Sequence, residues 1–179
     1  MSSQAVWVFG YGSLMWNPGF EHEEREIARL DGFSRSFCMH SIHHRGTPEE
    51  PGLVLALDRV EEARCEGVAF KVRRGAEDAT ISYLRERELI SSAYIETTLD
   101  IHLRDGRCVK ALTYIVDTDH NQYCGGMALE SQAKIIARAV GQRGANTEYL
   151  FNTVAHLEEL GLHDPDLIWL RDRVRKMTI

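Results

Sequence analysis

The segment VFGYGSLMW, residues 8–16, places two glycines and a serine where an apolar strand should end. Its spacing does not fit the loops best known for chemistry. A dinucleotide-binding loop needs a third glycine where Met15 stands, the P-loop pattern is absent, and a nucleophile elbow needs the pattern G-x-S-x-G. Two interpretations remain: a plain tight turn, or a turn whose unpaired backbone amides bind a carboxylate or a developing oxyanion.

A glutamate near the end of the segment 76–89 lies on the apolar face of a predicted helix. The helical period places Ile81, Leu84 and Glu88 on one face, whereas Glu86 falls on the opposite side, toward solvent. Burial raises the pKa of a carboxyl group, and a glutamate that titrates nearer neutrality can both accept and return a proton. The alternative is structural, with Glu88 extending to solvent or pairing with a neighbouring arginine.

Three histidines occur in HSIHHRG, residues 40–46, but without the spacing of common zinc sites. We expect no metal site here. We expect instead a strand end that leads into a loop, in which His44 and Arg45 position polar groups. A histidine-based metal hydrolase is retained as an alternative that chelation would test.

The segment GQRGANTEYL, residues 141–150, is a glycine-rich turn that begins a helix. Its amides could bind an anion, but capping by Asn146 or Thr147 explains the pattern equally well. Tyr149 lies in the first turn of this helix. Its hydroxyl could face a pocket, or its ring could simply pack.

The elements that must position these residues are mostly strands in the first part of the chain and helices in the last third. The predicted strands cover 5–11, 32–42, 52–58, 66–72, 94–103 and 108–116. A proline- and glycine-rich loop is expected at 45–52, and Asp105–Gly106 predicts a hairpin turn.

Three helices are expected after the last strand. Their predicted apolar faces are Leu129, Ala133, Ile136 and Val140, then Leu150, Val154 and Leu157, and finally Leu167, Leu170 and Val174. Asp164 and Pro165 are typical of the N-cap and first residue of the last helix. Strands followed by helices, without alternating βαβ units, predict an α+β fold. We expect one domain over residues 1–179.

Composition limits the classes of partner. The chain has 179 residues, is 44% hydrophobic, and carries 27 acidic against 21 basic residues, for a net charge of −6. This balance disfavours nucleic acid as a partner. No membrane span or leader is recognised, and four widely spaced cysteines favour reduced thiols and a cytoplasmic protein. Thiol pairing and the oligomeric state, monomer or homodimer, are left open.

Several motifs occur together in one order: VFGYGSLMW, HHRG followed by PG, EGVAF, YLRERE and GANTEYL. In this the chain resembles the ChaC family, the glutathione-specific γ-glutamylcyclotransferases, from about Val6 to Leu150. The resemblance implies a mixed β-barrel flanked by α-helices, without metal or organic cofactor. It also implies a reaction that cleaves the γ-glutamyl bond of glutathione, a small-molecule substrate, into 5-oxoproline and cysteinylglycine.

The resemblance implies that Glu88 is the general acid and base. The candidates for substrate binding are Tyr11, Gly12, Ser13, Leu14, Tyr149 and Arg45. Two rival functions remain at this point: a cyclotransferase acting on other γ-glutamyl peptides or amines, and a non-catalytic domain that binds a carboxylate ligand.

Overall fold

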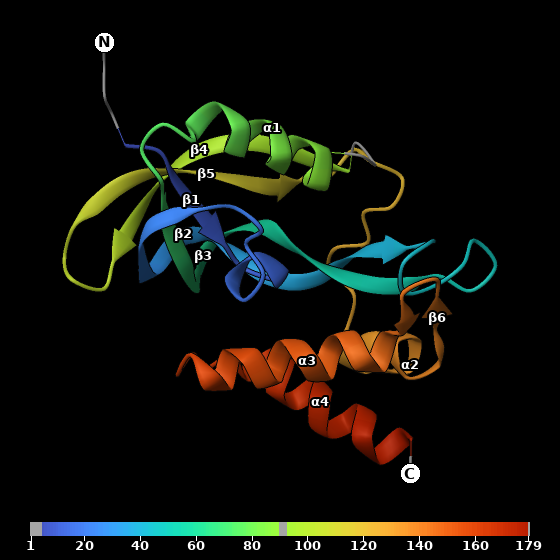
Figure 1. Ribbon diagram of the computed structural model, residues 1–179. Coiled ribbons are helices and arrows are strands. Elements are labelled where there is room, and N and C mark those ends of the chain that lie inside the picture. The colour runs from blue at the N-terminus through green and yellow to red at the C-terminus, as the bar shows by residue number, and fades with distance from the viewer. Residues whose placement is uncertain (1–4, 90–92, 179) are drawn as a thin grey trace. The chain divides into compact units, whose positions relative to one another are not determined.

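The computed structural model describes residues 5–89 and 93–178 (Figure 1). The elements in chain order are β1 (Trp7–Gly10), the 3-10 turn η1 (Ser13–Met15), β2 (His22–Ser41), β3 (Gly52–Val72), α1 (Glu77–Glu88), β4 (Tyr94–Leu103), β5 (Cys108–Val116), α2 (Leu129–Arg138), β6 (Val140–Gly141), β7 (Gly144–Ala145), α3 (Asn146–Glu159) and α4 (Pro165–Met177). The α+β prediction is confirmed.

Five strands form a closed barrel in the order β1-β3-β2-β4-β5. β1 pairs antiparallel to β3 and parallel to β5, where Trp7 lies opposite Ala111. The barrel is therefore mixed, as expected. Closure satisfies the backbone groups that an edge strand would expose.

Two strands are longer than predicted. β2 begins at His22, before the expected start at Gly32, and β3 is continuous where two separate strands were expected. The stretch that joins the two expected parts of β3 is 59–65, and its first four residues, 59–62, are exposed and mostly charged. It lacks the apolar signal of a strand because its side chains face solvent, yet its backbone continues the strand.

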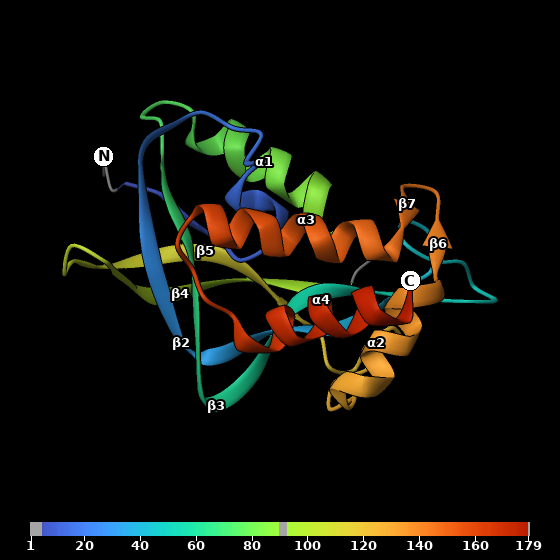
Figure 2. The ribbon, with the colours of Figure 1, turned by 90° about the horizontal axis from the view of Figure 1, so that it is seen from below.

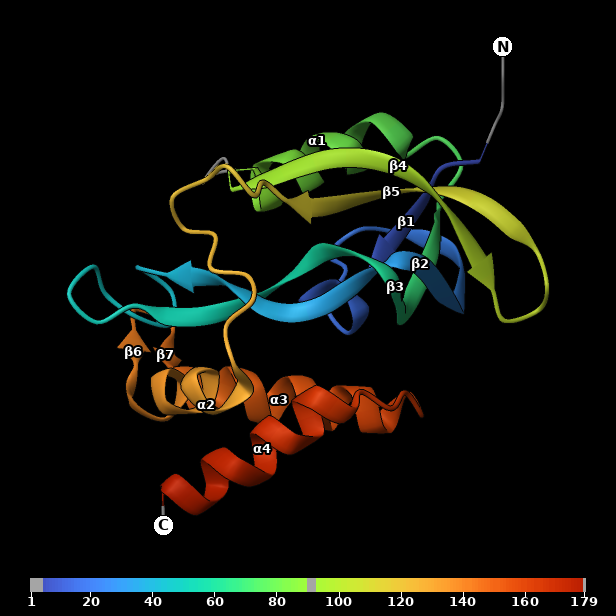
Figure 3. The ribbon, with the colours of Figure 1, turned by 180° about the vertical axis from the view of Figure 1, so that it is seen from behind.

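The chain forms two compact units. The first comprises the described residues of Met1–Arg35 and Ala56–His120. Within it, α1 runs alongside β4 and β5, as Figures 1 and 3 show from opposite sides. A buried cluster of Val8, Leu14, Val72, Leu84 and Tyr114 joins β1, η1, β3, α1 and β5. The expected β4–β5 hairpin has the predicted strand bounds, with Gly106 at φ 101° in its turn.

The second unit comprises Ser36–Leu55 and the described residues of Asn121–Ile179. Its helices α2, α3 and α4 pack against one another (Figure 2). The predicted faces of α3 and α4 are buried, and Asp164 Oδ1 accepts a hydrogen bond from Leu167 N at 3.2 Å, which confirms the predicted N-cap. Val140 was wrongly assigned to the face of α2. The helix ends at Arg138, and Val140 is 59% exposed in β6.

Other sequence expectations concern thiols, metals and membranes. None of the four cysteines forms a disulfide. In residues 5–89 and 93–178, no group of three or more His, Cys, Asp or Glu side chains could hold a metal ion. Over the same residues, no helix has the length and hydropathy needed to cross a membrane. The single-domain expectation stays a prediction.

Candidate active site

The segment 8–16 ends β1 and then turns sharply. Met15 N donates to Gly12 O at 2.9 Å, and Asn17 N donates to Ser13 O at 2.8 Å. The turn leaves no room for a side chain at Gly10, since a Cβ there would lie 2.9 Å from the Cβ of Leu14. Among the described residues, no acceptor receives the amides of Gly12, Ser13 or Leu14. The turn therefore offers the unpaired backbone donors that an anion site needs.

Glu88 is the last residue of α1, and its side chain is 19% exposed. Glu86 is exposed, so the helix separates its two late glutamates as the period predicts. Burial raises the pKa of Glu88 above its ordinary value of 4.5, and the adjacent Arg87 opposes this shift. Arg87 Nε lies 3.6 Å from Glu88 Oε1. A carboxylate with a raised pKa is suited to proton transfer.

Arg87 connects this helix end to the turn. Its Nη2 donates to Ser13 Oγ at 3.0 Å, and its Nη1 donates to the carbonyl oxygen of Asn17 at 2.7 Å. The residue beside Glu88 is thus hydrogen-bonded to the turn that carries the unpaired amides. Two residues 74 positions apart in the sequence come together in this way.

Arg85 does not pair with Glu88. It donates to Glu96 on β4 through both Nε and Nη2, the latter at 2.9 Å. Tyr114 on β5 donates its hydroxyl to the same carboxylate at 2.9 Å. Burial is the main cause of a raised Tyr114 pKa, and the charges of Glu96 and Glu88 add to it.

Sequence reasoning missed Tyr114 and Glu96, although a signal was available. A hairpin turn at Asp105–Gly106 places Glu96 opposite Tyr114, as the register shows. Tyr114 also packs in the cluster that holds Leu14. It therefore supports the turn from inside the barrel unit.

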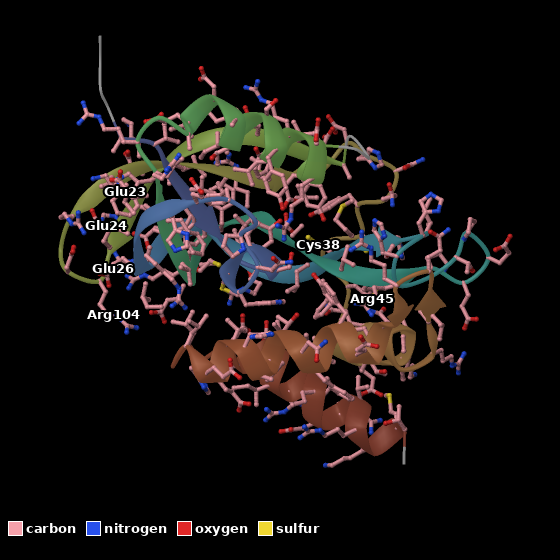
Figure 4. All side chains as sticks on the ribbon, viewed as in Figure 1. Glu23, Glu24, Glu26, Cys38, Arg45 and Arg104 are labelled. Carbon is pink, nitrogen blue, oxygen red and sulfur yellow. The ribbon has the colours of Figure 1, made fainter. Side chains whose placement is uncertain are left out.

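Arg45 and Tyr149 lie together in the second unit. The Arg45 guanidinium is 5.6 Å from the centre of the Tyr149 ring, and its Nη1 donates to the carbonyl oxygen of Ala145 at 3.1 Å. Figure 4 shows Arg45 beside the β6–β7 hairpin. The Tyr149 hydroxyl accepts a hydrogen bond from Leu55 N at 3.2 Å. In the structure, Arg45 lies beside Tyr149 in the second unit. Glu88 and the turn that follows β1 both belong to the first unit.

Asn146 does not cap α3. Ala145 occupies the N-cap position without a side-chain bond, and Asn146 is fully buried. Its Oδ1 accepts from Leu53 N at 2.8 Å, and its Nδ2 donates to Leu53 O at 2.9 Å. The side chain thus pairs with the N–H and C=O of Leu53 on β3, as the backbone of a neighbouring strand would.

The histidine segment behaves as a strand end that leads into a loop. The main-chain carbonyls of His43 and His44 accept hydrogen bonds from Gln142 N and Arg143 N, each at 2.8 Å. Burial, together with the charges of Arg143, His43 and Arg45, lowers the pKa of His44. This shift favours the neutral form of the His44 imidazole.

Comparison with known proteins relates nearly the whole chain to one protein family. A family model described as ChaC-like protein matches residues 6–177. The chain is 38% identical over 172 residues to a glutathione-specific gamma-glutamylcyclotransferase of Escherichia coli (strain K12), covering 96% of this chain and 74% of that protein. It is 36% identical over 177 residues to gamma-glutamylcyclotransferase 2-3 of Arabidopsis thaliana, covering 96% of this chain and 89% of the relative.

The fold has a counterpart among solved structures. The crystal structure of a yeast gamma-glutamyl cyclotransferase specific to glutathione superposes with a TM-score of 0.85 at 24% identity. The match covers 98% of this chain and all of the yeast chain. At this identity the superposition confirms the fold, a closed barrel with helices.

Proposed function

Because the chain belongs to the ChaC-like protein family, we propose that it is a γ-glutamylcyclotransferase that cleaves glutathione into 5-oxoproline and cysteinylglycine. The names of the bacterial and plant relatives support this reaction. The structural observation that carries the proposal is the hydrogen bond from Arg87 to Ser13. It brings the largely buried carboxyl group of Glu88 and a set of unpaired amides into one region.

The reaction exchanges one bond for another within a single substrate. The α-nitrogen of the γ-glutamyl group forms a bond to its own γ-carbonyl carbon, which closes a five-membered ring. The bond from that carbon to the cysteine nitrogen then breaks. Since both reacting groups belong to one molecule, the protein's main task is to hold the substrate in a folded, reactive conformation.

Glu88 is the residue we assign to proton transfer. The α-ammonium must lose its proton before it has a lone pair to attack with, and the departing cysteine nitrogen must gain one. A carboxylate whose pKa is raised by burial can accept the first proton and return it to the leaving nitrogen. The ring nitrogen releases a second proton to solvent as the lactam forms, and the departing amine takes up a proton from solvent to become an ammonium. Every step is a proton transfer or a bond exchange within the substrate, so the scheme requires no cofactor.

The turn Tyr11–Leu14 is the part we assign to charge stabilisation. The substrate carries an α-carboxylate, and negative charge develops on the γ-carbonyl oxygen during attack. The amides of Gly12, Ser13 and Leu14 are donors that can serve these anions. Arg45 and Tyr149 are proposed to contact other parts of the substrate. The four thiols, none of which forms a disulfide, support a cytoplasmic location.

Product formation tests this proposal. The purified protein should convert glutathione into 5-oxoproline and cysteinylglycine, and Glu88→Gln should lose at least about 100-fold in kcat. Glu86→Gln, on the solvent side of the same helix, is the matched control and should retain nearly full activity. An active Glu88→Gln protein would refute the mechanism, and absence of both products with the wild type would refute the substrate.

Substrate range is tested in the same assay. Rates with glutathione, γ-glutamylalanine and a γ-glutamylamine distinguish a glutathione enzyme from a broader cyclotransferase. We expect the highest kcat/KM with glutathione. Calorimetric binding of glutamyl compounds without turnover would instead favour a non-catalytic binding domain.

A further inference from the structure

Arg35 is a buried cation on β2 that contacts the backbone of the opening turn. Its exposed fraction is 6%. Removing a guanidinium from water is costly unless its donors find acceptors. Nε donates to the carbonyl oxygen of Tyr11 at 2.7 Å, and Nη2 donates to the carbonyl oxygen of Glu66. The positive charge is therefore held against the first residue of the turn.

The carbonyl of Tyr11 and the amide of Gly12 belong to one peptide group. This group is planar and trans, as are the others in the described residues, so its C=O and N–H point in opposite directions. Fixing the Tyr11 carbonyl on Arg35 therefore aims the Gly12 N–H away from Arg35. A cation at the carbonyl end also polarises the group, which makes the N–H a stronger donor.

Gly12 is buried, yet there is unfilled space on the side of this glycine where a side chain would lie. A Cβ built on Gly12 would meet no heavy atom within 4 Å. Its amide also has no acceptor among the described residues. An oriented and polarised donor thus lies beside unfilled space next to Gly12.

We propose that Arg35 is a positioning residue for the cyclotransferase reaction. It orients and polarises the Tyr11–Gly12 peptide, so that the Gly12 N–H stabilises negative charge on the γ-glutamyl group. Arg35 acts only through this peptide and does not itself touch the substrate. The inference rests on the proposed function, since it requires a γ-glutamyl substrate at the turn.

The first test replaces Arg35 with lysine. Lysine keeps the positive charge but has one nitrogen, which cannot bond to both carbonyls in the same geometry. We expect Arg35→Lys to retain its far-ultraviolet circular dichroism and to lose about tenfold or more in kcat/KM with glutathione. Arg29→Lys is the matched control on the same strand, where Arg29 is exposed and pairs with Asp31.

The wild type and Arg29→Lys should both form 5-oxoproline at closely similar rates. This separates the two ways of failing. An inactive wild type refutes the proposed function, whereas a folded Arg35→Lys protein with wild-type kcat/KM in the same assay overturns the role of Arg35.

The second test uses chemical rescue. Arg35→Ala removes the guanidinium, and added guanidinium ion at millimolar concentration should restore a large part of the lost kcat/KM. Urea at the same concentration has a similar shape but no charge, and it should restore little. A purely structural role predicts no such difference. If Arg35→Ala loses its folded structure and guanidinium does not restore activity, the proposal is overturned and Arg35 is a folding residue.

Discussion

Glu88 lowers the stability of the folded protein when it is ionised, and its proposed role in proton transfer would account for its burial. Its carboxyl group is largely buried, and the nearby positive charge of Arg87 compensates for this burial only in part, so its pKa is raised. A site that needs a base at neutral pH benefits from such a shift. The fold, however, loses stability when that buried group is ionised.

The cost of ionising Glu88 predicts a pH-dependent stability. Between the ordinary value of 4.5 and the raised pKa of Glu88, the folded protein binds more protons than the unfolded chain. Stability from this group is therefore lost as pH rises through that window. We expect Glu88→Gln to be more stable than the wild type at pH 8 in urea unfolding. The difference should shrink toward pH 4.5. Glu86→Gln should show no such trend, and a Glu88→Gln protein less stable at pH 8 would contradict the prediction.

Ser13 lies in the turn, but the proposed reaction needs no nucleophile from the protein. Its Oγ accepts a hydrogen bond from Arg87. Ser13→Ala should therefore lower kcat by about tenfold or less, the value of one hydrogen bond. Loss of a true nucleophile costs about 10⁴-fold or more. Steady-state rates with glutathione decide between these outcomes, with the exposed Ser131→Ala as the control.

At the scale of elements, the turn η1 depends on close backbone approach at one glycine and on open space at another. A methyl group at Gly10 would lie 2.9 Å from Leu14 Cβ, whereas one at Gly12 would meet no atom within 4 Å. We expect Gly10→Ala to cost about 1–3 kcal/mol of unfolding free energy, because it overpacks the turn. Gly12→Ala should lose less stability than Gly10→Ala but should lose activity, since its methyl group fills the space beside the Gly12 amide. Denaturant unfolding and 5-oxoproline assays separate the two variants, and equal stability losses would contradict this picture.

Asn146 joins the start of α3 to β3. Replacing it with alanine leaves the N–H and C=O of Leu53 without these partners in a buried environment. We expect Asn146→Ala to lose about 2–4 kcal/mol of unfolding free energy in urea. The exposed Asn152→Ala on the same helix should change it by less than about 0.5 kcal/mol. A neutral Asn146→Ala would show that these two hydrogen bonds contribute little to stability.

At the scale of the molecule, two barrel strands belong to both compact units. β2 passes from the first unit to the second after Arg35, and β3 passes back after Leu55. Neither unit contains either strand whole, so we propose that they fold as one domain. Calorimetry should then show a single transition with equal calorimetric and van't Hoff enthalpies. Two resolved transitions would contradict single-domain folding.

The sequence by itself determined whatever depends on residues close together in the chain. The helical period predicted that Glu88 faces inward. The Asp105–Gly106 turn predicted the pairing of β4 with β5, and Asp164 with Pro165 predicted the start of α4. These features follow from local dihedral preferences and spacing. The motif order also predicted the family, which the comparisons confirm.

Only the tertiary structure decided which distant groups meet. Arg35 bonds to Tyr11 across 24 positions, Arg87 to Ser13 across 74, and Asn146 to Leu53 across 93. In each case a side chain forms a hydrogen bond with a group in the turn or strand that is distant in the sequence. Such partners are set by strand pairing and chain crossing, so no local pattern in the sequence identifies them. An anion site at the amides of residues 12–14 could therefore be proposed from the sequence. The hydrogen bonds of Arg35 and Arg87 to that turn could be found only from the tertiary structure.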